Sequence, residues 1–144
     1  MTARRVAEAL RANPADRRTL AARGVRVAVC PRSNRNLGLG LPPVPALLEA
    51  GVALCLGTDS LASADSLDLL ADAALLQESF PGISPAVLVE MATASGAEAL
   101  GFEDLGTLAP EKSAEMAFAS AMRDVADPCA FLVSGAARAR RVIV

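Results

Sequence analysis

Short apolar runs alternate with helical patterns in the first two thirds of the chain. Residues 52–56 read V-A-L-C-L and residues 25–30 read V-R-V-A-V-C, each ending at Gly or Pro. Runs of this kind are typical of strands buried in a parallel sheet. Leucine and alanine at helical spacing then predict a helix that begins at Asp65 or Ser66 and ends near Glu78.

Capping and breaking residues predict the other elements of this part. Asn13 suits an N-cap, with Pro14 at the first helical position and Asp16 in the first turn, and that helix should stop by Gly24. We also expect helices at 4–12, 43–50, 85–91 and 93–100, and a glycine- and asparagine-rich loop at 31–43. The alternation of strands and helices indicates a parallel α/β fold.

The pattern changes after Gly101. Residues 105–108 and 115–120 look like short strands around a turn, Asp127 begins a short helical turn, and residues 141–144 look like the start of a strand. This part therefore predicts a small β structure following the α/β part.

Composition restricts the chemistry. The 144 residues are 53% hydrophobic with a formal charge of −2, which suits one globular domain. Histidine is absent, so a Ser-His-Asp triad, a Cys-His pair and a histidine zinc helix are excluded. The three cysteines are odd in number and widely spaced, which favours buried thiols in a reducing cytoplasm. We therefore expect a cytoplasmic protein, because no apolar run is long enough for a membrane span or a signal peptide.

Basic residues concentrate near the N-terminus. Nine arginines lie between Arg4 and Arg35, against only Glu8 and Asp16. Nucleic-acid binding would favour aromatic residues among these arginines, and this stretch has none. A solvated helix face explains the arginines better, so we expect no nucleic-acid partner.

Asp59 is the leading candidate for chemistry. It follows the strand 52–56 directly, within Gly57-Thr58-Asp59-Ser60. Functional residues of α/β folds gather where strands end. An Asx-turn or a helix cap would also explain a carboxylate at this point, and both interpretations stay open.

Three segments in this order resemble the amidohydrolase superfamily, specifically its branch of chlorohydrolases and aminohydrolases acting on nucleosides and triazines. They are C-P-R-S-N with L-G-L-G at 30–40, G-T-D-S-L-A-S at 57–63, and M-A-T to L-G followed by G-T-L and K-S-A-E at 91–115. Together they cover nearly all of the chain from Gly24 onward.

The resemblance implies the C-terminal part of a (β/α)8 TIM-type barrel. Residues 1–101 would supply strands seven and eight with their helices, and residues 102–144 would add short strands to a small β-sandwich domain. A whole barrel takes about 250 residues. Strand seven would then present an unpaired edge, and we expect the chain alone to be poorly stable, aggregation-prone or dependent on another chain.

The resemblance also implies a site. Members of this branch hold a divalent metal, zinc or iron, whose bound water displaces an amino group or chloride from a ring carbon. Asp59 would bind the metal and accept a proton from the water, and a purine- or triazine-like substrate would contact Ser33, Asn34, Gly40 and Ser60. A turn-forming role would equally explain Ser33 and Asn34, and a loop-structuring role is favoured for Ser60 and Ser63.

Departures from the family pattern leave alternatives open. The metal-binding histidines are absent, and Ala64, Glu111 and Glu115 replace the usual asparagine, glycine and aspartate. We therefore expect no stoichiometric metal in this chain alone. Zinc sites use three or four protein ligands, and only Asp59, Cys30 and Cys55 are candidate ligands here. The chain could be a non-catalytic truncated product, a partner subunit needing a separate N-terminal half, or part of a homo-oligomer. A nucleotide-binding domain is disfavoured because no phosphate-binding glycine motif is present.

Overall fold

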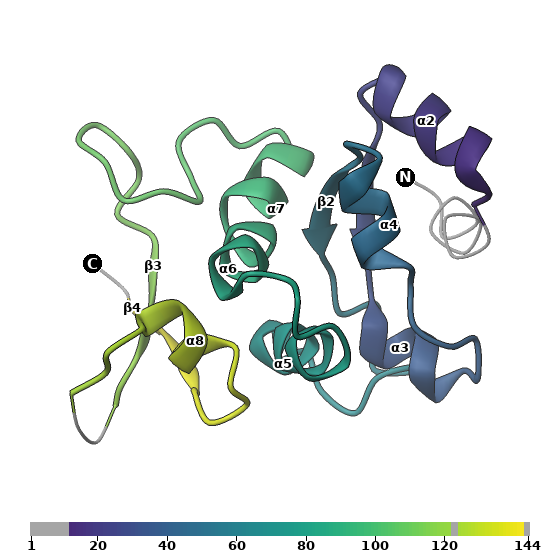
Figure 1. Ribbon diagram of the computed structural model, residues 1–144. Helices are drawn as coiled ribbons and strands as arrows, with labels where there is room; N and C mark the ends of the chain where they lie inside the picture. The colour runs from purple at the N-terminus through teal and green to yellow at the C-terminus, as the bar shows by residue number, and fades with distance from the viewer. Residues whose placement is uncertain (1–11, 122–123, 143–144) are drawn as a thin grey trace.

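A parallel pair of strands forms the centre of the molecule (Figure 1). The computed structural model describes residues 12–121 and 124–142. Strand β1, Arg26–Val29, pairs in parallel with β2, Ala53–Leu56, with Val27 opposite Leu54 and Val29 opposite Leu56. The prediction of two parallel strands at these positions is confirmed. Within the described residues the sheet stays two-stranded and open, so no closed barrel is present.

The core fills the space between this sheet and the helices. Alternate residues of β1, Val27 and Val29, are buried, and Leu54 and Leu56 of β2 join them in one apolar cluster. Leu76 and Leu88 complete the cluster from two helices that contact β2. One edge of β1 has no strand partner within the described residues.

Helix α2, Pro14–Ala22, forms as its sequence predicts. The Asn13 side chain accepts hydrogen bonds from the backbone N–H of Ala15 and Asp16, while the Asp16 carboxylate accepts one from the Asn13 N–H. This reciprocal capping satisfies donors that the first turn would otherwise leave unpaired. The helix predicted at 4–12 falls almost wholly outside the described residues.

The segment between the strands corrects one prediction. Residues expected to form a loop begin with a helix, α3, Pro31–Asn36, followed by α4, Val44–Glu49. Proline at the first position of α3 is compatible with a helix start. The helix is buried at residues 31–34, so tertiary contacts override the weak helix propensity of its Ser and Asn residues.

The helices after β2 form where the sequence predicts them, except that α5 begins later than expected. Helix α5, Leu69–Ser79, is capped by Asp68 instead of Asp65 or Ser66, because those two residues bind an arginine described below. Helices α6, Pro85–Ala92, and α7, Ala94–Ala99, follow as expected. No helix of the described residues is long and apolar enough to cross a membrane.

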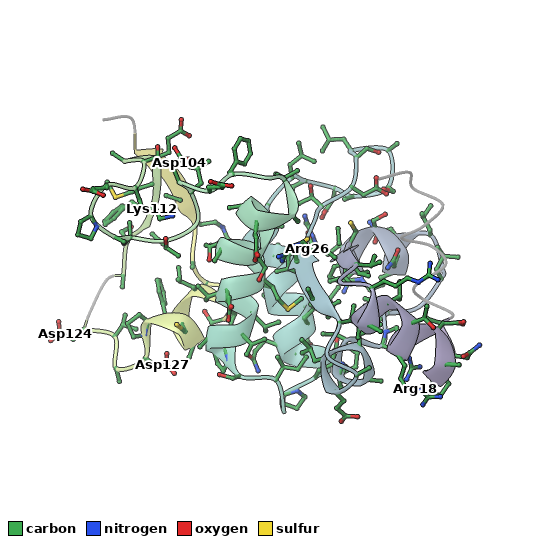
Figure 2. The ribbon with its side chains drawn as sticks, turned by 90° about the horizontal axis from the view of Figure 1, so that it is seen from above. Arg18, Arg26, Asp104, Lys112, Asp124 and Asp127 are labelled. Carbon is green, nitrogen blue, oxygen red and sulfur yellow. The ribbon has the colours of Figure 1, made fainter. Side chains whose placement is uncertain are left out.

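The last part of the chain, residues 102–142, is here called the tail. Strand β3, Met116–Ala119, pairs antiparallel with β4, Ala139–Val142, and α8, Pro128–Leu132, lies between them in sequence and contacts α6. Figure 2 shows Asp104, Lys112 and Asp127 of the tail on the side of the molecule opposite Arg18 of α2.

The strand predicted at 105–108 is wrong. Gly106 has a φ of +86°, and a Cβ there would lie 2.6 Å from the Ala94 Cα. The chain therefore turns tightly against α7 at this glycine, in a conformation that an extended strand does not adopt.

Candidate functional site

Asp59 lies in the loop of residues 57–68 that leaves β2, here called the β2 loop. Since β1 and β2 are parallel, this loop and helix α3 both leave the sheet at the same edge. The Gly57 N–H donates to the Val29 carbonyl at 2.9 Å and carries the ladder one step beyond the strands. Asp59 therefore stands beside the start of α3, as expected for a strand-end site.

Two serine hydroxyls hold one oxygen of Asp59. The Ser33 Oγ lies 2.9 Å and the Ser63 Oγ 3.0 Å from Asp59 Oδ2, and the two hydroxyl oxygens are 2.8 Å apart. Each hydroxyl has one proton, so the three short contacts share two protons.

The second oxygen of the carboxylate, Oδ1, lacks the hydrogen bonds that Oδ2 makes within the described residues. No described residue hydrogen-bonds Asp59 Oδ1, and the residue as a whole is exposed. Its φ is +61°, in the left-handed region that non-glycine residues seldom adopt. A strained backbone conformation at an exposed carboxylate is a common arrangement at functional sites.

The other predicted site residues have different surroundings. Ser60 shapes the β2 loop, since its carbonyl accepts from the backbone N–H of Ser63 and Ala64. Asn34 is buried, and its Nδ2 has no partner among the described atoms. Gly40 is exposed at a φ of +78° between α3 and α4. The structure thus joins Ser33 to Asp59 directly, and no described hydrogen bond joins Asn34 or Gly40 to it.

Cys30 is the other titratable group beside Asp59. Burial, with the nearby Asp59 and Asp72 carboxylates adding to it, raises the pKa of the Cys30 thiol to about 11. A Cβ on Gly57 would lie 3.0 Å from the Cys30 Sγ, so this glycine makes room for the thiol. The buried Cys55 also has a raised pKa, caused by burial. Both side chains therefore behave as neutral core thiols at neutral pH.

Sequence reasoning missed Arg32, the most extensively bonded side chain near the site. It is only 6% exposed, and its guanidinium bonds Asp72 of α5 and the β2 loop. Burial raises the pKa of the Asp72 carboxyl, while hydrogen bonds from the Arg32 backbone and side chain act in the opposite direction. The sequence signal was a lone acid within L-L-A-D-A-A-L-L, because a charge in an apolar helical run needs a buried partner.

The described residues do not fit a metal ion by themselves. No three Cys, Asp or Glu side chains within 12–121 and 124–142 gather as ligands, and the chain has no histidine. Zinc takes four ligands in structural sites and three protein ligands in catalytic ones. We therefore derive no reaction step through a metal for this chain alone.

Comparison with protein families finds one match. Residues 6–142 match the model of the amidohydrolase family. A 5-methylthioadenosine/S-adenosylhomocysteine deaminase from Desulforudis audaxviator is 47% identical over 110 residues, covering 71% of this chain and 26% of that protein. An aminodeoxyfutalosine deaminase from Deinococcus radiodurans is 39% identical over 88 residues, covering 61% of this chain and 21% of that protein.

Solved structures agree with this match. A zinc-bound adenosine deaminase from Xanthomonas campestris superimposes with a TM-score of 0.77 at 32% identity, over 87% of this chain and 31% of that one. A zinc-complexed atrazine chlorohydrolase from Arthrobacter aurescens gives 0.76 at 30% identity, over 87% and 30%. The chain thus spans about a fifth to a third of the length of these proteins.

Proposed function

Because the chain belongs to the amidohydrolase family, we propose that it is the C-terminal segment of a hydrolytic deaminase and supplies the Asp59 carboxylate to the active site. The family assignment and the deaminases and chlorohydrolases among the similar proteins support hydrolysis at a ring carbon. A purine-like ring carrying an amino group is the substrate class that we propose, with a triazine as the second choice.

The geometry of Asp59 is the observation that carries this proposal. Two serines bond Oδ2, Oδ1 has no hydrogen-bond partner among the described residues, and Asp59 is exposed at the end of a buried parallel strand. A cap or turn aspartate uses its oxygens on nearby backbone N–H groups, as Asp68 does at α5. No described backbone N–H bonds the Asp59 side chain, which favours the proposed role over a helix cap or an Asx-turn.

The metal belongs to the whole protein in this proposal. Similar structures contain zinc, and a divalent cation, zinc or iron, would lower the pKa of a bound water. We propose that Asp59 is one of its ligands and the proton acceptor, and that the remaining ligands come from outside the described residues. Ser33 then positions Asp59, and Asn34, whose buried Nδ2 has no partner among the described residues, remains a candidate substrate contact.

A second candidate function is a non-catalytic chain or a subunit that needs an N-terminal partner. The absence of any gathered metal-binding group among the described residues favours it for the isolated chain. The two candidates differ in one measurable property. If this chain is a segment of an active deaminase, an active relative should keep its deaminase activity when its matching segment is replaced by this chain. If this chain is non-catalytic, the same replacement should abolish the activity.

The test is a chimera with the Desulforudis deaminase, whose 110-residue matching segment is exchanged for that of this chain. We expect metal-dependent ammonia release from 5-methylthioadenosine, S-adenosylhomocysteine or adenosine. Asp59→Asn should lower kcat/KM by about 10²- to 10⁴-fold, the usual worth of a proton-transfer group. Asp104→Asn, an exposed aspartate of the tail, serves as the matched control and should have no effect.

Two results would contradict the proposal. A folded, metal-loaded chimera without activity on all three substrates would favour the non-catalytic chain. Tight one-to-one zinc on the isolated chain, lost in Asp59→Ala, would instead show an autonomous site that needs no outside ligands.

A further inference from the structure

We infer that Arg32 is a positioning residue for the Asp59 carboxylate, acting through the β2 loop and Ser33. This inference rests on the proposed function, in which Asp59 carries the chemistry. No described hydrogen bond or ion pair joins Arg32 to Asp59 itself. Its role would be to fix the two segments that carry the serine hydroxyls bound to Asp59 Oδ2.

All five guanidinium N–H groups of Arg32 find acceptors. Nε donates to Asp72 Oδ2 at 3.0 Å, and Nη1 donates to Asp65 Oδ1 at 2.7 Å and to Ser66 Oγ at 2.9 Å. Nη2 donates to the carbonyls of Ser66 at 2.7 Å and Asp68 at 3.2 Å. A full set of bonds from a planar, rigid donor group fixes the positions of its acceptors relative to one another.

These bonds divide into two sets with different surroundings. The bond to Asp72 is deeply buried and joins α3 to α5, strengthened by the Arg32 backbone N–H, which donates to Asp72 Oδ1 at 3.0 Å. The other four bonds reach the β2 loop, where Asp65 is largely exposed. Attachment of α3 to α5 needs only the first set. The second set fixes a surface loop that would otherwise have few tertiary bonds.

The fixed points lie next to both contacts of Asp59. Ser33 follows Arg32 in the chain, and Ser63 precedes Asp65 by two residues. The Asn36 Nδ2 adds a third tie between α3 and the loop, donating to the Ser63 carbonyl at 3.0 Å. Asp59 itself has a φ of +61°, a conformation that persists only where surrounding structure enforces it. Arg32 therefore determines the separation of the Ser33 and Ser63 hydroxyls, which hold Asp59 in this backbone conformation.

The network is complete within the described residues. Every acceptor of the Arg32 side chain belongs to residues 65–72, so the inference does not depend on what the rest of a longer protein contributes. An inference from an exposed apolar surface of this chain would depend on the rest of a longer protein, because residues outside the chain could cover that surface.

The experiment uses the full 144-residue chain and separates the two sets of bonds. The double variant Asp65→Asn/Ser66→Ala weakens only the loop set, and Arg32→Lys weakens both. Arg35→Met, on the exposed side of the same helix, is the matched control. Two quantities are measured by NMR, the carboxyl ¹³C chemical shift of Asp59 and the exchange rates of the Ser63 and Ala64 amides, which bond the Ser60 carbonyl.

We expect both Asp65→Asn/Ser66→Ala and Arg32→Lys to change the carboxyl ¹³C chemical shift of Asp59. Both should also speed hydrogen exchange of the Ser63 and Ala64 amides by about 10-fold or more. The double variant should do so at an unchanged denaturant midpoint of unfolding. Arg35→Met should change neither quantity. In the active chimera, the double variant should lower kcat by about 10-fold with KM within twofold of the parent, because small misplacement of a reacting group slows the chemical step.

An unchanged Asp59 signal and unchanged amide exchange in the double variant would overturn the inference and leave Arg32 as a structural residue only. An inactive chimera combined with a shifted Asp59 signal has a different meaning. It would overturn the proposed function while supporting the positioning role.

Discussion

The parallel sheet with its helices and the tail are built from strands of equal length, yet they differ in what covers those strands. β1 and β2 place Val27, Val29, Leu54 and Leu56 in a buried cluster that is covered by helices. β3 has the same four-residue length, but Phe118 is 59% exposed and Met116 is also exposed. The free energy of burial follows area removed from water, so the two regions cannot contribute equally to stability.

The polar contacts differ in the same way. In the sheet region, Arg32 reaches 33 to 40 residues along the chain to Asp65 and Asp72. In the described part of the tail, Lys112 donates to the Glu103 carbonyl nine residues away, and the Asp127 side chain accepts from the Ala130 N–H three residues away. We therefore expect one cooperative unit around the sheet and a tail that depends on it through the contact between α8 and α6.

The largest effect should come from Arg32→Met in the sheet region. Among the described residues, this change leaves the buried Asp72 with only the backbone N–H of residue 32 as a hydrogen-bond partner. Breaking one side of a buried ion pair costs about 3–5 kcal/mol. We expect a loss near the lower end of that range, measured by urea unfolding at pH 7.5, because the backbone bond remains.

The pH dependence of that loss tests its cause. Burial already raises the pKa of Asp72, and removing the guanidinium raises it further above the unfolded-state value of about 3.9. The destabilisation is then fully present above the raised pKa and shrinks as the pH falls through it, because the buried acid becomes neutral. The loss should be smaller at pH 5 than at pH 7.5. The variant Arg32→Met/Asp72→Asn should remove this difference, and an equal loss at both pH values would contradict the explanation.

A matched pair of leucines gives the next largest effect. Leu88 of α6 is fully buried, whereas Leu108 of the tail is 85% exposed. Leu88→Ala should cost about 3 kcal/mol, within the usual 2–5 for a buried leucine. Leu108→Ala should lie within about 0.5 kcal/mol of the parent, as for ordinary surface changes.

Denaturant midpoints of both variants check this prediction. A large loss in Leu108→Ala would show that the tail carries stability in solution through a contact of that leucine, for example between two copies of the chain. Repeating the measurement at a tenfold lower protein concentration would separate such an association from a contact within one chain.

Local signals allowed much of this fold to be predicted, and long-range contacts explain the failures. The cap of α2 was predictable because Asn13, Pro14 and Asp16 act within one turn. Helix α3 was missed because its residues favour loops locally, and Arg32 holds it through partners more than 30 residues away. The same arginine engages Asp65 and Ser66, which moves the cap of α5 to Asp68.

For the candidate site, the sequence indicated positions and no tested roles. Asp59 could be singled out because it follows a strand, and the structure joins Ser33 to it, while the catalytic and metal-binding role of Asp59 stays a prediction. The direct bond from Ser33 to Asp59 and the part played by Ser63 could not be found, because a hydroxyl's partner depends on how two distant loops meet. A role for Ser33, Asn34, Gly40 and Ser60 in contacting substrate stays a prediction.

The smallest predicted difference in unfolding free energy is between two N-cap variants, one in the sheet region and one in the tail. The Asp68 side chain accepts from the N–H of Leu70 and Ala71 at the start of α5, and Asp127 accepts from the Ala130 N–H at the start of α8. Replacing an N-cap aspartate by alanine costs about 1 kcal/mol of helix stability. Because α5 has 11 residues packed into the core and α8 has five with none buried, we expect the full cost for Asp68→Ala.

For Asp127→Ala the expected loss in global unfolding is under about 0.5 kcal/mol, since fraying at the end of a five-residue helix without buried residues stays local. Amide exchange at Ala130 should nevertheless accelerate, which shows that the cap is broken locally. Equal losses in the two variants would mean that the tail unfolds together with the sheet, and the contact of α8 with α6 would then belong to the same cooperative core.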